Sequence, residues 1–92
     1  MDVNEINNST LVSLYPNPAR EELFVATGPL KGRKAKIFVA DILGQEIIQI
    51  EQATDQSGRL FAQLQLDILS DGIYFLRIET DKESLVQRFV KK

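Results

Sequence analysis

Apolar and polar residues alternate along much of this chain, in short runs that turn-forming residues separate. In residues 60–66 every second position is leucine or alanine, and in residues 73–80 Tyr74, Leu76 and Ile78 share one face. A period of two is typical of strands with one buried and one exposed face. No segment of helical length has an apolar period of 3.6 residues, and residues 66–69 suit one helical turn and nothing longer. The pattern therefore predicts an all-β domain.

About seven strands are predicted, at the spacing of roughly 8 to 12 residues that is typical of antiparallel sandwiches and barrels. Residues 36–40 are apolar on both faces, which indicates a central position in a sheet. In residues 22–27, Leu23 and Val25 share one face. The predicted strands cover residues 11–15, 22–27, 36–40, 46–52, 60–66, 73–80 and 84–91.

Proline, aspartate and glycine mark the turns between these strands. Pro16-Asn17-Pro18 ends the first strand, because two prolines fix φ and remove two hydrogen-bond donors. Asp41 and Gly44 begin and end a four-residue segment that suits a type I turn. The Asp41 carboxylate can accept from the turn amides, and Gly44 tolerates the left-handed conformation that follows. Residues 55–58 repeat this pattern, so we expect two turns of the same kind.

A length of 92 residues allows one domain, which at this size buries only about 60 to 65 % of the surface of its unfolded chain. Because there is no cysteine, neither a disulfide nor a thiolate metal site can brace the fold, and an apolar content of 43 % must supply the core. Residues 1–10 are polar and rich in asparagine, and we expect a flexible linker there before a domain at residues 11–92. Met1 is either the native start or an initiator residue on a fragment of a longer protein.

Charge and hydropathy argue against two classes of partner. The net charge of −2, with both signs interspersed, argues against a nucleic-acid binder, and no apolar run approaches the roughly 18 residues of a membrane span. The first residues lack the basic region and apolar stretch of a secretory signal, and the absence of cysteine assigns no compartment. A basic cluster comprises Lys31, Arg33, Lys34 and Lys36. These residues either dock an acidic surface or form a solvated turn, and we favour the solvated turn.

Catalysis needs a group that titrates near neutral pH or an activated nucleophile, and the chain has neither histidine nor cysteine. A carboxylate pair of the glycosidase type is formally available. Each candidate aspartate, however, adjoins a turn glycine or a strand end, where its carboxylate normally accepts hydrogen bonds from the backbone; the candidates are Asp41, Asp55, Asp67 and Asp71. No Asp-x-Asp-x-Asp-Gly calcium motif occurs. The sequence therefore predicts no enzyme, no cofactor and no metal site.

The aromatic residues give a mixed signal. Tyr15 and Tyr74 lie in apolar patterns that predict core positions, and the chain has no tryptophan, which argues against the exposed platform of a sugar-binding sandwich. Four phenylalanines are out of phase with the predicted core faces, namely Phe24, Phe38, Phe61 and Phe75. Either the phase of some strands is wrong or part of the outer surface is apolar. We favour isolated exposed rings over a contiguous patch, which would mark a partner site.

Four segments stand out for their order and spacing: Leu14-Tyr15-Pro16-Asn17-Pro18, Asp41-Ile42-Leu43-Gly44-Gln45-Glu46, Leu69-Ser70-Asp71-Gly72-Ile73-Tyr74-Phe75-Leu76 and Leu85-Val86-Gln87-Arg88-Phe89-Val90-Lys91-Lys92. Each is common by itself. Together they cover nearly the whole predicted domain and resemble the C-terminal sorting domain of the type IX (Por) secretion system of Bacteroidetes.

The resemblance implies an Ig-like antiparallel β-sandwich that acts as an address and not as an enzyme. Such a domain is recognised by the outer-membrane translocon, directs a covalently fused upstream cargo to the cell surface or the medium, and is usually then removed by a sortase-like peptidase. The removal site would correspond to somewhere in residues 2–10, where no cleavage motif is visible. We assign signal content to Gly72, Tyr74, Phe89, Val90, Lys91 and Lys92, and support of the fold to Pro16, Asn17, Pro18, Asp41 and Gly44.

Physical reasoning adds a way in which the last strand could be recognised. If it lies at a sheet edge, its unpaired N–H and C=O groups are open to strand addition by another chain, while Lys91 and Lys92 keep that edge soluble. Alternatively, the strand merely completes the sandwich and the lysine pair is a solubilising end. Two other functions stay open: an Ig-like or fibronectin-like spacer or adhesion module of a surface protein, and a small carbohydrate-binding β-sandwich, which a surface strip of aromatic residues would reveal.

Overall fold

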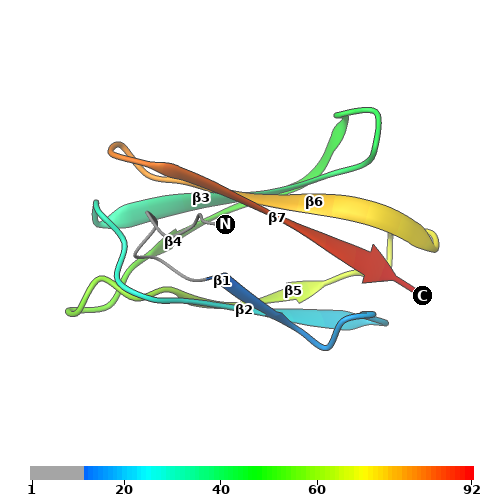
Figure 1. Ribbon diagram of the computed structural model, residues 1–92, viewed down its shortest axis with the longest axis horizontal. Helices are drawn as coiled ribbons and strands as arrows, with labels where there is room; N and C mark the ends of the chain where they lie inside the picture. The colour runs from blue at the N-terminus through cyan, green and yellow to red at the C-terminus, as the bar shows by residue number, and fades with distance from the viewer. Residues whose placement is uncertain (1–11) are drawn as a thin grey trace, which may run out of the picture.

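The computed structural model describes residues 12–92, which form seven strands and no helix. The strands are β1 (Val12–Tyr15), β2 (Glu22–Thr27), β3 (Lys34–Ala40), β4 (Glu46–Ala53), β5 (Phe61–Gln65), β6 (Gly72–Glu79) and β7 (Ser84–Lys91). They make two antiparallel sheets that face each other (Figure 1). The predicted all-β, Ig-like sandwich of seven strands is confirmed. The predicted linker at residues 1–10, together with Leu11, lies outside the described residues.

The order of the strands places β7 at an edge. One sheet has the order β1-β2-β5 and the other has the order β4-β3-β6-β7. The central position predicted for residues 36–40 is confirmed, because β3 lies between β4 and β6 and its residues Ile37, Phe38 and Val39 are buried. Phe38 faces outward and is covered by the guanidinium group of Arg77, whose Cζ lies 4.4 Å from the ring centroid.

The core consists of side chains that point inward from alternate positions of both sheets. The predicted alternation is confirmed in β2, in residues 60–66 and in β6. Burial of each large apolar side chain contributes roughly 1.5–3 kcal/mol to folding. Residues 66–69 form a single turn, closed by a hydrogen bond of 2.9 Å from the Leu69 amide to the Leu66 carbonyl. The largest fully buried side chains are Leu23, Val25, Ile37, Val39, Leu60, Leu66, Leu76, Ile78 and Phe89.

The turn between β3 and β4 has the predicted chemistry. The Asp41 carboxylate accepts hydrogen bonds from the amides of Leu43 at 2.9 Å and Gln45 at 3.0 Å. Gly44 has a φ of 86°, a conformation that costs glycine little and most other residues much more. The prediction made for Asp41 and Gly44 is therefore confirmed.

Asp55 caps the second predicted turn, because its carboxylate accepts from the hydroxyl and amide of Ser57 and from the amide of Arg59. The Ser57 hydroxyl, followed by the Arg59 amide, holds the pKa of Asp55 below its ordinary value. The prediction of backbone hydrogen bonds is wrong for Asp67 and Asp71. Both residues are exposed to water, and within residues 12–92 neither carboxylate has a hydrogen-bond partner.

Candidate functional site

The C-terminal end of β7 lies against a segment from the other end of the domain (Figure 1). We call this segment, residues 16–19, the edge cap. It follows β1 directly, since the β1 strand ends at Tyr15 as the two prolines predicted. Ala19 is fully buried and forms an isolated parallel bridge with Lys91. The edge cap therefore acts as a very short additional strand beside β7.

Three hydrogen bonds join the edge cap to β7. The Val90 amide donates to Oδ1 of Asn17 at 3.1 Å, the Ala19 amide donates to the Val90 carbonyl at 2.8 Å, and the Lys92 amide donates to the Ala19 carbonyl at 2.8 Å. The last strand does lie at a sheet edge, which was the condition for strand addition, but the unpaired backbone groups expected there are paired at Val90 and Lys92. The physical reason is that the chain after β1 turns back across this edge and supplies the missing partners.

The remainder of the β7 edge is open. Backbone groups of successive residues in an antiparallel pair point alternately toward and away from the partner strand. Because the groups of Val90 point away from β6, those of Ser84, Val86 and Arg88 do so as well. Within the part of the chain that the structure describes, these outward groups have no partner. We call these three residues the open edge.

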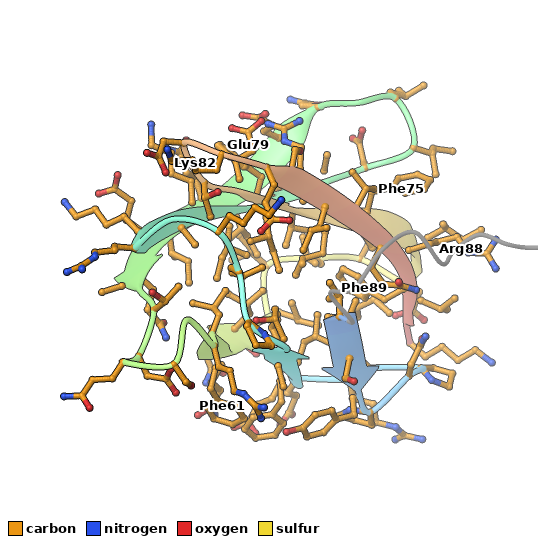
Figure 2. The ribbon with its side chains drawn as sticks, turned by 60° about the vertical axis from the view of Figure 1, so that its left-hand side comes forward. Phe61, Phe75, Glu79, Lys82, Arg88 and Phe89 are labelled. Carbon is orange, nitrogen blue, oxygen red and sulfur yellow. The ribbon has the colours of Figure 1, made fainter. Side chains whose placement is uncertain are left out.

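Two of the residues assigned to the signal lie in the core. Phe89 is fully buried and Tyr74 is 6 % exposed, and their rings stack with a centroid distance of 5.8 Å. The Tyr74 hydroxyl donates to the Ser70 carbonyl at 2.7 Å. Figure 2 shows Phe89 inside the sandwich. Gly72 opens β6 opposite Lys91. A partner of the folded domain cannot contact the rings of Tyr74 and Phe89 directly.

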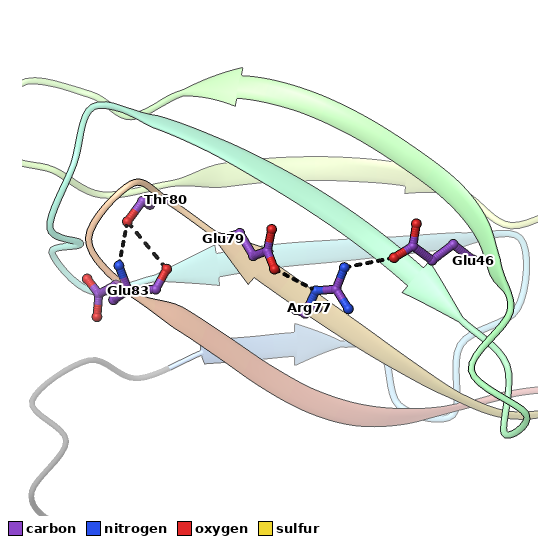
Figure 3. A network of polar contacts seen from close by, with 5 residues as sticks. All are labelled: Glu46, Arg77, Glu79, Thr80 and Glu83. Carbon is purple, nitrogen blue, oxygen red and sulfur yellow. Dashed lines mark hydrogen bonds and ion pairs between the residues drawn. The ribbon is translucent and has the colours of Figure 1, made fainter.

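The basic side chains of β7 differ from the arginine on the neighbouring strand. Arg77 of β6 is neutralised by Glu46 at 2.8 Å and Glu79 at 3.1 Å (Figure 3). In contrast, the charges of Arg88 and the two terminal lysines form no ion pair with any residue of the described range 12–92. The C-terminal half of β7 and Lys92 after it therefore carry positive charge that no carboxylate of residues 12–92 neutralises.

The outer face of the β6–β7 hairpin carries exposed apolar side chains among charged ones, since Arg77, Glu79 and Arg88 share it. Val86 is 61 % exposed, and Ile73 and Phe75 on β6 are 43 % and 37 % exposed. Phe75 lies directly opposite Arg88 in the register of the two strands, and Figure 2 shows both on the same side of the hairpin. An exposed apolar surface with an unpaired cation beside it is a candidate contact surface.

A second apolar feature lies on the outer face of the other sheet, on the far side of the sandwich from Phe75 (Figure 2). Tyr15 stacks on Phe24 with a centroid distance of 5.5 Å, and Phe24 stacks on Phe61 at 6.1 Å. The core position predicted for Tyr15 is wrong, since this side chain is 44 % exposed and Leu14 is the one that packs on the core. The preference for isolated exposed rings is also wrong here, because the three rings form a contiguous row.

The aromatic row is the kind of strip that a carbohydrate-binding sandwich would have. Sugar rings, however, stack on exposed aromatic faces. Phe24 has a neighbouring ring on each side and is only partly exposed, so Tyr15 and Phe61 are the more accessible rings of the row. The four phenylalanines face outward, and the phase predicted for β2, for residues 60–66 and for β6 was right.

The predicted basic cluster does not form a surface of one sign. Its members Arg33, Lys34 and Lys36 line an open groove at one end of the sandwich, and carboxylates line the same groove, namely Glu51, Asp55, Glu79 and Asp81. This mixture supports a solvated turn. No group of three acidic side chains that could hold a metal occurs in residues 12–92, and no helix among those residues could cross a membrane.

Sequence reasoning missed Ala19 and the residues of the open edge. Ala19 is a small residue after a proline, and nothing local indicates that its backbone pairs with a strand more than 70 residues away. The exposed Val86 was visible only as one member of an alternating run. Its significance depends on the neighbours that β7 has in the sheet.

Comparison with known families gives a match over the part of the chain that contains these surfaces. A family model for the secretion system C-terminal sorting domain matches residues 13–92. The match includes the edge cap, the β6–β7 hairpin and the open edge. No curated protein matches the chain.

Proposed function

Because this chain belongs to the family of type IX secretion C-terminal sorting domains, we propose that it delivers a covalently fused upstream protein to the type IX translocon. The cargo would then cross the outer membrane and reach the cell surface or the medium. The family is one of sorting signals and not of enzymes. The proposed role therefore requires recognition by a partner and no chemistry within the domain.

The observation that carries the proposal is the assembly of two distant motifs into one surface. The edge cap and β7 are joined through Asn17, Ala19 and Val90, over a sequence separation of 73 residues for the pair Asn17 and Val90. Lys91 and Lys92 lie beside this junction, and neither side chain forms an ion pair with another residue of the range 12–92. A partner that reads this surface recognises a folded domain and can distinguish it from an unfolded tail.

Five of the six residues assigned to the signal divide into two groups under this proposal, and the sixth, Gly72, begins β6 opposite Lys91. Val90, Lys91 and Lys92 contribute through exposed or half-exposed side chains. Tyr74 and Phe89 contribute through the core that holds β6 and β7 together. Substitutions in the first group should affect export without unfolding the domain, and those in the second group should affect both.

We further infer that a sortase-like peptidase removes the domain after transport, within residues 2–10. This segment is polar and precedes β1. The proposal names no scissile bond. Mass spectrometry of the exported cargo would locate the cut, and a cargo that keeps the whole domain would contradict this step alone.

A reporter fusion tests the main proposal. Residues 11–92 are appended to a folded periplasmic reporter in a host that has the type IX system, and a strain without the translocon is the control. We expect the reporter on the surface or in the medium only in the host with the system. Retention of the intact fusion in the periplasm of that host would contradict the proposal.

Removal of residues 86–92 tests the terminal strand, and we expect it to abolish export while the reporter stays folded. This truncation also removes Phe89 from the core, so a second variant is needed. Replacing Lys91 and Lys92 together by alanine leaves the core intact and should reduce export at unchanged thermal stability. Unchanged export after the truncation would show that the last strand carries no signal.

A further inference from the structure

We propose that the open edge is where the partner binds, and that the occupant is an extended peptide segment that carries a carboxylate flanked by apolar side chains. The segment would pair with β7 from Ser84 to Arg88 as an additional strand of the four-stranded sheet. This inference rests on the proposed function, and it specifies the part of the domain that is recognised and the chemistry of the partner.

The first step is the direction of the backbone groups, which two ends of the hairpin fix independently. At the turn, the Thr80 amide donates to the Glu83 carbonyl at 2.9 Å, so this pair faces inward and the next pair, at Ser84, faces outward. At the other end, Val90 faces outward to the edge cap. The register of β6 with β7 runs without a shift between these ends. Val86 and Arg88 therefore direct their N–H and C=O groups away from the sheet.

The second step is the extent of the open edge. The edge cap occupies the outward groups of Val90 and Lys92 and blocks pairing there. From Ser84 to Arg88 the edge is about 14 Å long, at roughly 3.4 Å per residue. This length suits a strand of about five residues, a common strand length in proteins. The edge cap thus sets the register at which a partner strand can add.

The third step is that the middle of this edge lacks the usual protection, since Arg88 places a charge only at one end of it. Natural sheets cover their edges or place charges and prolines on them. Here the cover stops before Arg88, and the middle of the open edge is Val86, an uncharged side chain that is 61 % exposed. An added strand would pack an outward apolar side chain beside Val86 and bury surface that is now in water.

The fourth step is charge complementarity. Residues 84–92 contain three basic residues and no acidic residue, and Arg88 has no ion-pair partner within residues 12–92. A partner strand would place one side chain next to Arg88 on the outer face of the sheet. A carboxylate at that position forms a charge-assisted pair with the guanidinium group. The chemistry of the edge therefore selects an acidic segment with apolar neighbours.

The test uses the reporter fusion with a proline at the open edge. Val86→Pro removes an N–H that points away from β6, so the hairpin keeps its hydrogen bonds while a partner strand loses one and meets the proline ring. We expect export to fall about tenfold or more. The matched control is Gln63→Pro on β5. Gln63 is exposed on an edge strand. Residues 60 and 66 direct their backbone groups toward β2, since the Leu60 carbonyl accepts from Thr27 and the Leu66 amide donates to Glu21. Gln63 lies an odd number of residues from both, so its N–H points away from the sheet.

Charge is tested with Arg88→Glu, for which we expect a similar loss of export, while Arg88→Lys should retain most of it. Lys82→Glu, on the exposed hairpin tip seen in Figure 2, is the control and should export normally. Thermal unfolding of each purified chain shows whether it is folded. If Val86→Pro is unfolded, Arg88→Glu decides, since it changes an exposed side chain and leaves the backbone intact.

The outcomes separate this inference from the proposed function. An unmodified fusion that stays in the periplasm contradicts the proposed function itself. The open edge is not the binding site if the parent and a folded Val86→Pro variant are both exported normally. It is also not the binding site if Gln63→Pro loses as much export as Val86→Pro. Normal export of Arg88→Glu overturns the acidic occupant. Dimers of the purified chain that Val86→Pro abolishes would show instead that a second copy occupies the edge.

Discussion

The hydrogen bond from the Val90 amide to Asn17 offers a direct test of the edge cap. Asn17→Ala removes the acceptor, which lies 3.1 Å from the Val90 nitrogen, and leaves both flanking prolines in place. The two bonds that Ala19 makes with Val90 and Lys92 do not involve the Asn17 side chain, so the bridge should persist. The variant therefore isolates one bond between segments 73 residues apart.

The expected magnitude follows from the position of that bond. An intramolecular hydrogen bond contributes about 0.5–1.5 kcal/mol net to stability. Val90 is half-buried, so water can replace part of the lost interaction, and we expect about 1 kcal/mol. At 1.4 kcal/mol per factor of ten, this corresponds to roughly fivefold faster exchange of the Val90 amide hydrogen.

Amide hydrogen exchange followed by NMR is the appropriate assay, because it resolves single residues. In the parent chain the Val90 amide should be protected, while those of Val86 and Arg88 on the open edge should exchange rapidly. Asn17→Asp is the matched control, since its carboxylate can still accept the bond, and it should restore protection. An unchanged Val90 rate in Asn17→Ala, or an Asn17→Asp rate as fast as that of the alanine variant, would refute the proposed role of Asn17.

Two further predictions concern the core and the turns. Phe89→Ala removes a fully buried ring that stacks on Tyr74, and it should lower the free energy of unfolding by about 3–5 kcal/mol in denaturant titrations. Val86→Ala on the outer face should change this free energy by less than about 0.5 kcal/mol. Similar losses in the two variants would contradict the placement of Phe89 in the core. Asp55 has a lowered pKa in the folded chain, so its ionised form stabilises the fold above its unfolded pKa of about 3.9, and this contribution is lost as the pH falls through the folded pKa. The difference in melting temperature between the parent and Asp55→Asn should therefore be largest near neutral pH and shrink as the pH falls below about 4; a difference that is independent of pH would count against this account.

Local patterns were sufficient for the strands and the turns. The alternation in residues 60–66 and in β6 identified their buried faces, because a strand with one face in water repeats its side-chain direction every two residues. The Asp41 and Gly44 turn was likewise predictable, since its hydrogen bonds and its positive φ involve only neighbouring residues. β1 was harder, because Val12, Leu14 and Tyr15 break strict alternation within four residues. Its phase depends on which side of a short edge strand faces the second sheet.

The residues assigned to recognition were also only partly predictable from local patterns. The sequence pointed to the β6–β7 hairpin as a unit, through the motif around Gly72 and the basic last strand. Nothing in these segments could show that Phe89 points into the core while Arg88 and Val86 point outward on the open edge. The alternation allows either phase, and only packing of the hairpin against the other sheet selects one.

The sequence by itself determined the all-β class, the approximate positions of the strands, the turns at Asp41 and Asp55 and, through its motifs, the family. Tertiary structure decided which strand ends a sheet and what covers it. The pairing of Asn17 and Ala19 with the last strand closes the C-terminal end of the β7 edge and leaves the edge from Ser84 to Arg88 open. Periodicity cannot predict such a pairing, because it reports only the faces of one strand. Hydrogen bonds at an edge depend on where another part of the chain passes, and that is fixed only when the two sheets pack together.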